Sequence, residues 1–321
     1  MRAAIKQLGI ANLVLLGSLL NESRLAKADV AYTFTTITDP NAAGKIDVRA
    51  INNNGQILGT LTNASATHFF VDTNGSFATI AFDFPLHTAA AGFNDTDQIV
   101  GWYTALGASH GYVYANGAFT ALDFPGATTY GGTQAYAIND LGQIVGGYAD
   151  SSGAHGFLYS RGTINPLDLP FSLVTPTAIN NKGEIVGQFG AGSSAASFLD
   201  ANGTFTTFQD PNATQGTYAT GINDNGEIVG YFFDSTGSHG FIDSSGVFTT
   251  IDAPSATSGT YLLGVNDSGE LLGSYADRRR SYGFIAVKPP SSVPEPRTLP
   301  ALAGCVAVVA IFCYRRLRLP V

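Results

Sequence analysis

The chain has 321 residues, of which 45% are hydrophobic, 11% aromatic and only 12% charged, and its formal net charge is −8. So many aromatic residues exclude a disordered polar chain, which could not bury enough apolar surface to offset its chain entropy. The 38 glycines and the low charge argue against a helical bundle and indicate a protein rich in strands and turns.

The charge is distributed unevenly along the chain. Residues 29–288 contain eight basic and 22 acidic residues, which gives them a net charge of −14. A domain that acidic repels phosphate backbones, so we expect no binding to nucleic acid. The one basic cluster in this region is interpreted either as a solvated loop tip or as a candidate ligand-binding patch, and consists of Arg278, Arg279 and Arg280.

Residues 1–28 have the three parts of a secretory signal peptide. Arg2 and Lys6 provide a positive start, residues 8–20 are apolar, and Ala26 and Ala28 form a small-x-small cleavage site. We therefore expect export and cleavage after Ala28. The alternative is a buried N-terminal helix.

Six copies of a ten-residue pattern follow between residues 50 and 273. Each copy has a small residue, an apolar residue, Asn, then Asn or Asp, and ends in an apolar pair and Gly. The spacing between copies is 41 to 45 residues, as shown by their shared asparagines Asn52, Asn94, Asn139, Asn180, Asn223 and Asn266. This period, with four short strands per copy, is typical of β-propeller blades.

The third copy illustrates the expected blade. Residues 139–142 predict a tight turn, because Asn and Asp bond to their own backbone and Gly accepts positive φ. Residues 143–148 and 156–159 predict the second and third strands. The fourth strand is clearer in residues 118–123 and 247–252, where apolar and polar residues alternate.

The sixth copy ends at residues 283–287 without a fourth strand. Residues 32–39 precede the first copy and match the missing strand. We therefore expect residues 29–288 to form an all-β, six-bladed β-propeller, closed where the strand around Phe34 pairs beside Phe284. Closure removes exposed sheet edges. A β-solenoid is the alternative, but it does not explain the displaced strand.

The repeat resembles the extracellular HAF-type repeats of bacteria. The resemblance covers nearly all of residues 32–287, and the fourth copy departs from it at residues 191–197. It implies an extracellular protein, but it implies no activity for any named residue.

The C-terminal end has three parts in a fixed order. Residues 289–297 are a proline-rich linker, residues 299–314 are apolar, and a basic end follows. Sixteen helical residues span about 24 Å against a hydrocarbon core of about 30 Å, so residues 298–321 predict a short transmembrane helix with a cytoplasmic basic end. The residues that carry this pattern are Val293, Pro294, Glu295, Pro296, Arg315, Arg316 and Arg318.

This tail resembles the PEP-CTERM sorting signal of exported bacterial proteins. The resemblance implies processing near Pro294–Pro296 by an exosortase, in a bacterium that produces exopolysaccharide. We expect the C-terminal helix to anchor the chain transiently in the membrane, before release to the cell surface or the extracellular matrix. An ordinary C-terminal anchor is the alternative.

Metal and cofactor sites are not expected. Four histidines lie sixteen residues after repeated asparagines, namely His68, His110, His155 and His239. Each lies at the start of an expected strand, so we expect it to form a hydrogen bond to a neighbouring turn. As a metal site they would have to meet within about 2.1 Å of one ion. The acidic turns at 224–227 and 267–270 lack the alternating ligands of a calcium loop, so weak calcium binding is only an alternative there.

The sequence favours a binding protein over an enzyme. An active site needs unique residues, whereas the polar residues here recur, and no serine has the spacing of a hydrolase elbow. Trp102 is unrepeated, and is a candidate for stacking on a sugar ring or for packing within its blade. We expect a non-enzymatic propeller that binds exopolysaccharide, another glycan or a matrix protein. The alternatives are a secreted polysaccharide hydrolase or lyase with its site on one propeller face, and a purely structural spacer that binds no ligand.

Overall fold

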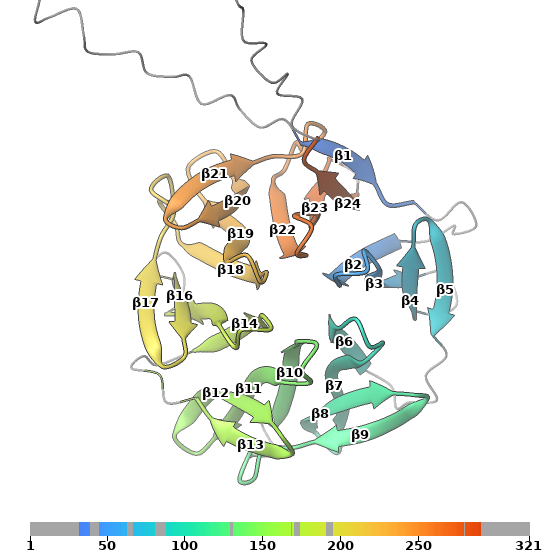
Figure 1. Ribbon diagram of the computed structural model, residues 1–321, viewed down its shortest axis with the longest axis vertical. Helices are drawn as coiled ribbons and strands as arrows, with labels where there is room; N and C mark the ends of the chain where they lie inside the picture. Colours follow the sequence, from blue (N-terminus) through green and yellow to red (C-terminus); the bar gives the residue numbers. More distant parts are fainter. Residues whose placement is uncertain are drawn as a thin grey trace, which may run out of the picture. The chain divides into compact units, whose positions relative to one another are not determined.

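Antiparallel sheets make up most of the part of this chain that the structure describes. The computed structural model describes residues 32–38, 45–62, 67–80, 88–128, 131–167, 169, 174–190, 195–278 and 280–289. In these residues the chain forms six four-stranded sheets, which follow one another around a common axis as the blades of a propeller (Figure 1). The strands nearest the axis are β2, β6, β10, β14, β18 and β22.

The strands of each blade follow the chain from the axis outward. Blade 1 contains β2 (Lys45–Ile51), β3 (Ile57–Thr62), β4 (Thr67–Thr73) and β5 (Ser76–Ile80). Blade 2 contains β6 (Thr88–Phe93), β7 (Ile99–Ala105), β8 (Ala108–Ala115) and β9 (Ala118–Leu122). Blade 3 contains β10 (Thr133–Ile138), β11 (Ile144–Asp150), β12 (Gly153–Ser160) and β13 (Thr163–Pro166).

The second half of the chain repeats this order. Blade 4 contains β14 (Thr175–Ile179), β15 (Ile185–Phe189), β16 (Ala196–Ala201) and β17 (Thr204–Phe208). Blade 5 contains β18 (Thr217–Ile222), β19 (Glu227–Phe233), β20 (Ser238–Ser244) and β21 (Val247–Ile251). Blade 6 contains β22 (Thr260–Val265), β23 (Leu271–Ala276), β24 (Ser281–Val287) and the first strand of the chain, β1 (Thr33–Thr36).

The N-terminal strand completes blade 6. β1 pairs antiparallel with β24, from Thr33 opposite Val287 to Thr36 opposite Phe284. The ring of Phe34 lies 5.2 Å from that of Phe284. The predicted closure of the propeller by this strand is confirmed, and the ring of blades excludes the solenoid alternative.

The turn after each inner strand has the predicted geometry. In the third repeat the amide of Gly142 donates to the carbonyl of Asn139 over 3.1 Å, and Gly142 has a φ of +73°. Asp97 replaces this glycine in the second repeat and takes a φ of +60°. Aspartate tolerates this left-handed conformation better than most residues.

The hydrophobic core lies between the blades. The second strand of every blade contributes an aliphatic side chain with no exposed surface, namely Leu58, Val100, Val145, Val186, Val229 and Leu272. These side chains belong to clusters that join adjacent sheets; for example, Val145 of β11 packs with Ile179, Ile185 and Phe198 of blade 4. Each blade is therefore stabilised mainly by its neighbours, as in other repeat architectures.

Each inner strand also contains a β-bulge. In all six pairings between a first and a second strand, one residue has no partner in the register. The six unpaired residues are Arg49, Ala91, Tyr136, Thr177, Thr220 and Leu263. A bulge changes the direction of a side chain and is often found beside functional sites.

Several expectations fall outside the described residues. The signal peptide, the proline-rich linker from residue 290 and the C-terminal sorting tail lie there, and so does Arg279. In the part of the chain that the structure describes, no helix has the length and apolar character needed to cross a membrane.

Candidate functional site

Two layers of polar residues lie at the end of the axis where the repeated turns meet. The repeated asparagines form the outer layer, which we call the amide ring, and each is only 2–4% exposed. Each side-chain amide donates a hydrogen bond to the backbone carbonyl of the corresponding asparagine in the next blade, over 2.9–3.3 Å. The last of these bonds runs from Asn266 to Asn52 and closes the circle.

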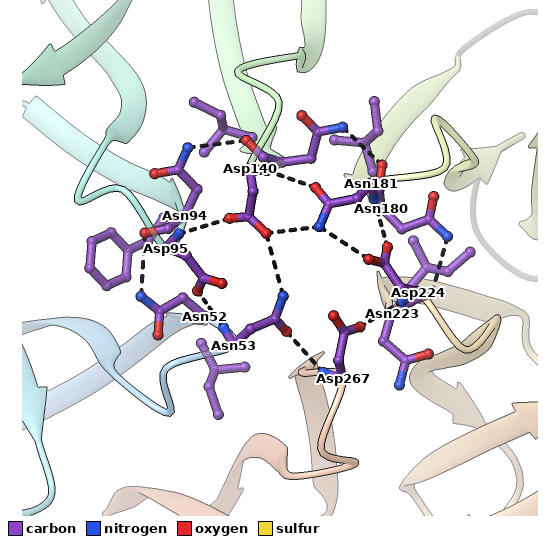
Figure 2. A pocket seen from close by; sticks show the side chains of 16 residues that line it. Asn52, Asn53, Asn94, Asp95, Asp140, Asn180, Asn181, Asn223, Asp224 and Asp267 are labelled. Carbon is purple, nitrogen blue, oxygen red and sulfur yellow. Dashed lines mark hydrogen bonds between the residues drawn. The ribbon is translucent and has the colours of Figure 1, made fainter.

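The residues that follow the asparagines form a second closed circle, the axial ring (Figure 2). Each backbone amide donates to the side-chain oxygen of the equivalent residue in the next blade, over 2.7–2.9 Å. The axial ring consists of Asn53, Asp95, Asp140, Asn181, Asp224 and Asp267. The two rings fasten six blades at one end of the axis.

The axial ring concentrates negative charge. Four of its six members are aspartates, and they surround a pocket of about 80 Å³. Burial raises the pKa of Asp267; the amide of Asp224 counteracts this by hydrogen bonding, while the charges of Asp224, Asp140 and Asp95 raise it further. The amide of Asn181 separates two of the carboxylates, donating to Asp140 over 2.8 Å and to Asp224 over 3.1 Å.

The acidic turns form hydrogen bonds between neighbouring blades. One oxygen of each aspartate of the axial ring accepts a backbone amide from the preceding blade. Across the described ranges, no group of three or more His, Cys, Asp or Glu side chains has an arrangement suited to a metal ion. Backbone hydrogen bonds form turns at residues 224–227 and 267–270, as the sequence predicted.

A second space lies further along the axis, and we call it the axial cavity. It has a volume of about 170 Å³, and all six bulge residues line it. Five residues line both this cavity and the pocket of the axial ring, and so form an apolar layer between them: Ile51, Phe93, Ile138, Ile179 and Ile222. Because the bulge residues differ from blade to blade, this cavity lacks the sixfold repetition of the surrounding fold.

Arg49 is the single charged side chain among the residues that line the axial cavity. It is exposed, and it forms no hydrogen bond or ion pair with any residue in the described ranges. The acidic residue nearest to it along β2, Asp47, is paired with Lys45 over 2.9 Å. The charge of Arg49 therefore has no protein counter-ion among the described residues.

Three hydroxyl groups of the cavity lining already donate their protons. The hydroxyl of Thr177 donates to the carbonyl of Ala219 over 2.9 Å, and that of Thr220 donates to Leu262 over 2.8 Å. The hydroxyl of Tyr136 donates to the side-chain oxygen of Gln134 over 2.8 Å. The oxygens of these three hydroxyls remain available as acceptors.

Aromatic side chains accompany the inner strands. Trp102 is half-buried and packs edge-on against Tyr136, with ring centroids 5.8 Å apart. In blades 5 and 6, Tyr231 stacks on Tyr218 at 5.1 Å and meets Tyr261 edge-on at 4.9 Å. Trp102 of blade 2 thus contacts Tyr136 of blade 3, which lines the axial cavity.

Three of the four recurring histidines, all except His68, contact acidic residues of nearby turns. His110 lies 3.1 Å from Asp123, and His155 lies 3.1 Å from Asp150. Each ring also stacks on an aromatic residue of the preceding strand, Tyr103 or Tyr148. Hydrogen bonds from Ser152, with a further contribution from His155, lower the pKa of Asp150 to about 2. These contacts agree with the predicted hydrogen bonds to neighbouring turns.

His239 has two carboxylate neighbours. It lies 2.8 Å from Asp252 and 3.3 Å from Asp234. Burial alone would lower its pKa, but the hydrogen bond and charge of Asp252, together with those of Asp234, raise it overall. Its ring stacks on Phe232 at 5.3 Å, so this histidine also fastens the outer part of its blade. His68 is exposed.

The ligand-binding residues proposed from the sequence do not form one site. Trp102 lies in β7 of blade 2, whereas Arg278 and Arg280 are exposed in the turn between β23 and β24 of blade 6. The bulge residues were missed. Their signal was present as a variable position three residues before each repeated asparagine, directly before a small residue and an apolar residue that recur in every copy.

Comparisons with known proteins give the fold. No family model matches the chain, and no curated protein matches it. Among solved structures, TolB from Acinetobacter baumannii is 12% identical over 63% of this chain and 52% of its own, with a TM-score of 0.51. A gluconolactonase from Xanthomonas campestris is 11% identical over 84% of this chain and 94% of its own, with a TM-score of 0.50.

The likeness shows a β-propeller. The chain spans about half the length of the TolB chain that it matches. At 11–12% identity the likeness assigns no function, and the names of these two proteins describe different functions.

Proposed function

We propose that this chain is an exported, non-enzymatic propeller of the cell envelope or extracellular matrix, which binds a glycan or protein partner in its axial cavity. The observation that carries the proposal is the set of bulge residues. Six equivalent bulges bring four kinds of group into one cavity: one cation, one phenol, two hydroxyls and two apolar groups. The surrounding motif is repeated in every blade, so the variation of the bulge residue favours a role in binding a ligand.

The absence of catalysis is part of this proposal. The bulge residues that line the cavity include neither a carboxylate nor a histidine, the usual general acids and bases. The aspartates of the axial ring lie beyond the apolar layer and are hydrogen-bonded to neighbouring blades. Both features favour recognition over turnover.

Export and sorting are proposed from the two ends of the sequence. The N-terminal pattern with Ala26 and Ala28 favours signal cleavage, and the motif Val293–Pro296 favours processing by an exosortase. Mass spectrometry of the secreted protein should give Asp29 as the first residue and a C-terminus near Pro294–Pro296. A secreted chain that still ends at Val321 would contradict the processing.

The binding proposal is tested by filling the cavity from a bulge. Ala91→Tyr adds a phenol at the position where blade 3 already carries Tyr136, so the variant should fold. On an array of extracellular glycans and in pull-downs from matrix material, the native protein should bind and Ala91→Tyr should not. Ala118→Tyr, on exposed β9, is the matched control and should bind normally. Equal binding by all three proteins would place the ligand elsewhere, and turnover of a polysaccharide would favour an enzyme.

A further inference from the structure

We infer that the axial cavity selects a carboxylated sugar, a uronic acid residue whose carboxylate pairs with Arg49. The inference rests on the proposed function, because it names the ligand class of the same cavity. It follows from two features of the lining residues: Arg49 lacks a counter-ion, and the hydroxyl oxygens can only accept further hydrogen bonds.

The first requirement of the ligand is an anionic group. Arg49 is the one cation of the lining, and it has no hydrogen-bond or ion-pair partner among the described residues. Asp47, the acidic residue nearest to Arg49 along β2, pairs with Lys45 and forms no ion pair with Arg49. A guanidinium presents a planar fork of donors that fits a carboxylate with two parallel hydrogen bonds.

The second requirement is a set of hydroxyl donors. Thr177, Thr220 and Tyr136 line the cavity, and each has given its hydroxyl proton to another protein group. Their oxygens can only accept further hydrogen bonds. A buried ligand acceptor placed against them would stay unsatisfied, whereas a ligand hydroxyl can donate to them.

A uronic acid meets both requirements on one ring. Its carboxylate accepts from Arg49, its hydroxyls donate to the threonine and tyrosine oxygens, and its C–H face can lie against the ring of Tyr136. Packing against Trp102 holds that ring in place. A neutral sugar would leave Arg49 unpaired, and a peptide carboxylate brings few hydroxyl donors for the other groups.

The test compares acids with their neutral esters. The purified protein is titrated calorimetrically with glucuronic and galacturonic acid disaccharides and with their methyl esters. At least one acid should bind about tenfold to a hundredfold more tightly than its ester, the range expected for a hydrogen bond to a charged group. Arg49→Gln should abolish this preference, and Arg49→Lys should retain part of it.

The matched control removes a cation elsewhere. Arg161 occupies an exposed hairpin turn with a φ of +53°, where the equivalent residues are Asn74, Asn116 and Asn202. Arg161→Asn should therefore fold normally and keep the full preference for the acid. Urea unfolding of each variant verifies that Arg49→Gln remains folded, because its side chain packs no core.

Three outcomes would overturn the inference. They are equal affinity for acid and ester, an acid preference that survives Arg49→Gln, and binding of a short peptide with a free C-terminus as tight as that of the acids. If neutral glycans or a protein partner still bind, the proposed function stands without Arg49 selectivity. If no glycan or partner binds at all, both proposals fail.

Discussion

At the scale of single residues, the repeated asparagine joins its own turn to the next blade through hydrogen bonds. Asn139 donates to Asn180 of the next blade and to Gln143 of its own turn, and its side-chain oxygen accepts two turn amides. Asn139→Ala would leave several buried groups without partners, so we expect a loss of about 3 kcal/mol in the free energy of unfolding. Urea denaturation measures this loss.

Leu141 provides the control for that substitution. It lies in the same turn but is 69% exposed, and the sixth repeat has Ser268 at its position. Leu141→Ser should change the free energy of unfolding by less than about 0.5 kcal/mol. If the two variants were equally stable, the amide ring would not hold the blades together.

The sequence predicted the turn of this asparagine but not its bond to the next blade. Asn, Gly and their spacing specify a local turn within four residues. The acceptor in the next blade lies 41 to 45 residues away, and its position depends on the angle between two packed sheets. Local propensity carries no information on that angle, so the rings emerge only with the assembled fold.

Asp210 is a buried acid at a position where other blades have apolar residues. Its backbone amide donates to Thr217, as those of Phe124 and Ala253 donate to the equivalent threonines. Its side chain is 2% exposed, and one carboxylate oxygen has no hydrogen-bond partner among the described residues. Burial raises the pKa of Asp210, although hydrogen bonds from Asn212 and the charge of His239 oppose this.

This shift predicts a specific pH dependence. The pKa of Asp210 is higher in the folded protein than in the unfolded chain, so protonation of Asp210 stabilises the fold. This stabilisation is complete below the pKa of the unfolded chain and is lost as the pH rises through the pKa of the folded protein. Asp210→Asn should therefore gain stability relative to the native protein between pH 4 and pH 7. Urea unfolding at several pH values measures this difference, and a constant difference for Asp210→Asn would contradict the prediction.

At the scale of strands, the last glycine of the motif lets two strands and an aromatic ring meet. A Cβ atom at Gly146 would overlap the carbonyl oxygen of Gln134 and lie 2.6 Å from the ring of Phe157. Gly146→Ala should destabilise the protein by about 3 kcal/mol or more, since neither the backbone nor a fully buried ring can move away. Thermal and urea unfolding measure the effect.

A second glycine gives the comparison. At Gly264 a Cβ atom would approach only Ile51, at 3.3 Å, and other repeats have Ala50, Ala137 or Ala178 at this position. Gly264→Ala should cost less than about 1 kcal/mol. Similar losses for both variants would mean that the glycines act through chain entropy, not through close packing.

The strands were predictable because their repetition reinforces weak signals, but the bulges were not. The predicted fourth strands at 118–123 and 247–252 match β9 and β21 to within one residue. The bulge residues share no residue type, since one is arginine, one tyrosine and one alanine. A bulge follows from the register of two paired strands, which alternation along one strand does not specify.

At the scale of the whole molecule, the propeller closes through contacts between the two ends of its sheet region. β1 pairs with β24, and the seam is joined on the axis by bonds from Asn266 to Asn52 and from Asp267 to Asn53. The ring should open first between β1 and β24, because these paired strands are not consecutive along the chain, unlike the other neighbouring strands of the six sheets. Repetition predicted this closure, since one strand was missing at one end and surplus at the other.

Phe34 tests the closure. Its half-buried ring contacts Phe284, so Phe34→Ala should lower the free energy of unfolding by about 1–2 kcal/mol. The loss should be local: hydrogen exchange should quicken in β24, which gains an exposed edge when β1 detaches, but not in the equivalent strand β20 of blade 5. Thr35→Ala, an exposed change in the same strand, is the control and should leave exchange unchanged. Faster exchange in β20 and β24 alike would mean that the blades open together and that the seam is no weaker than the other interfaces.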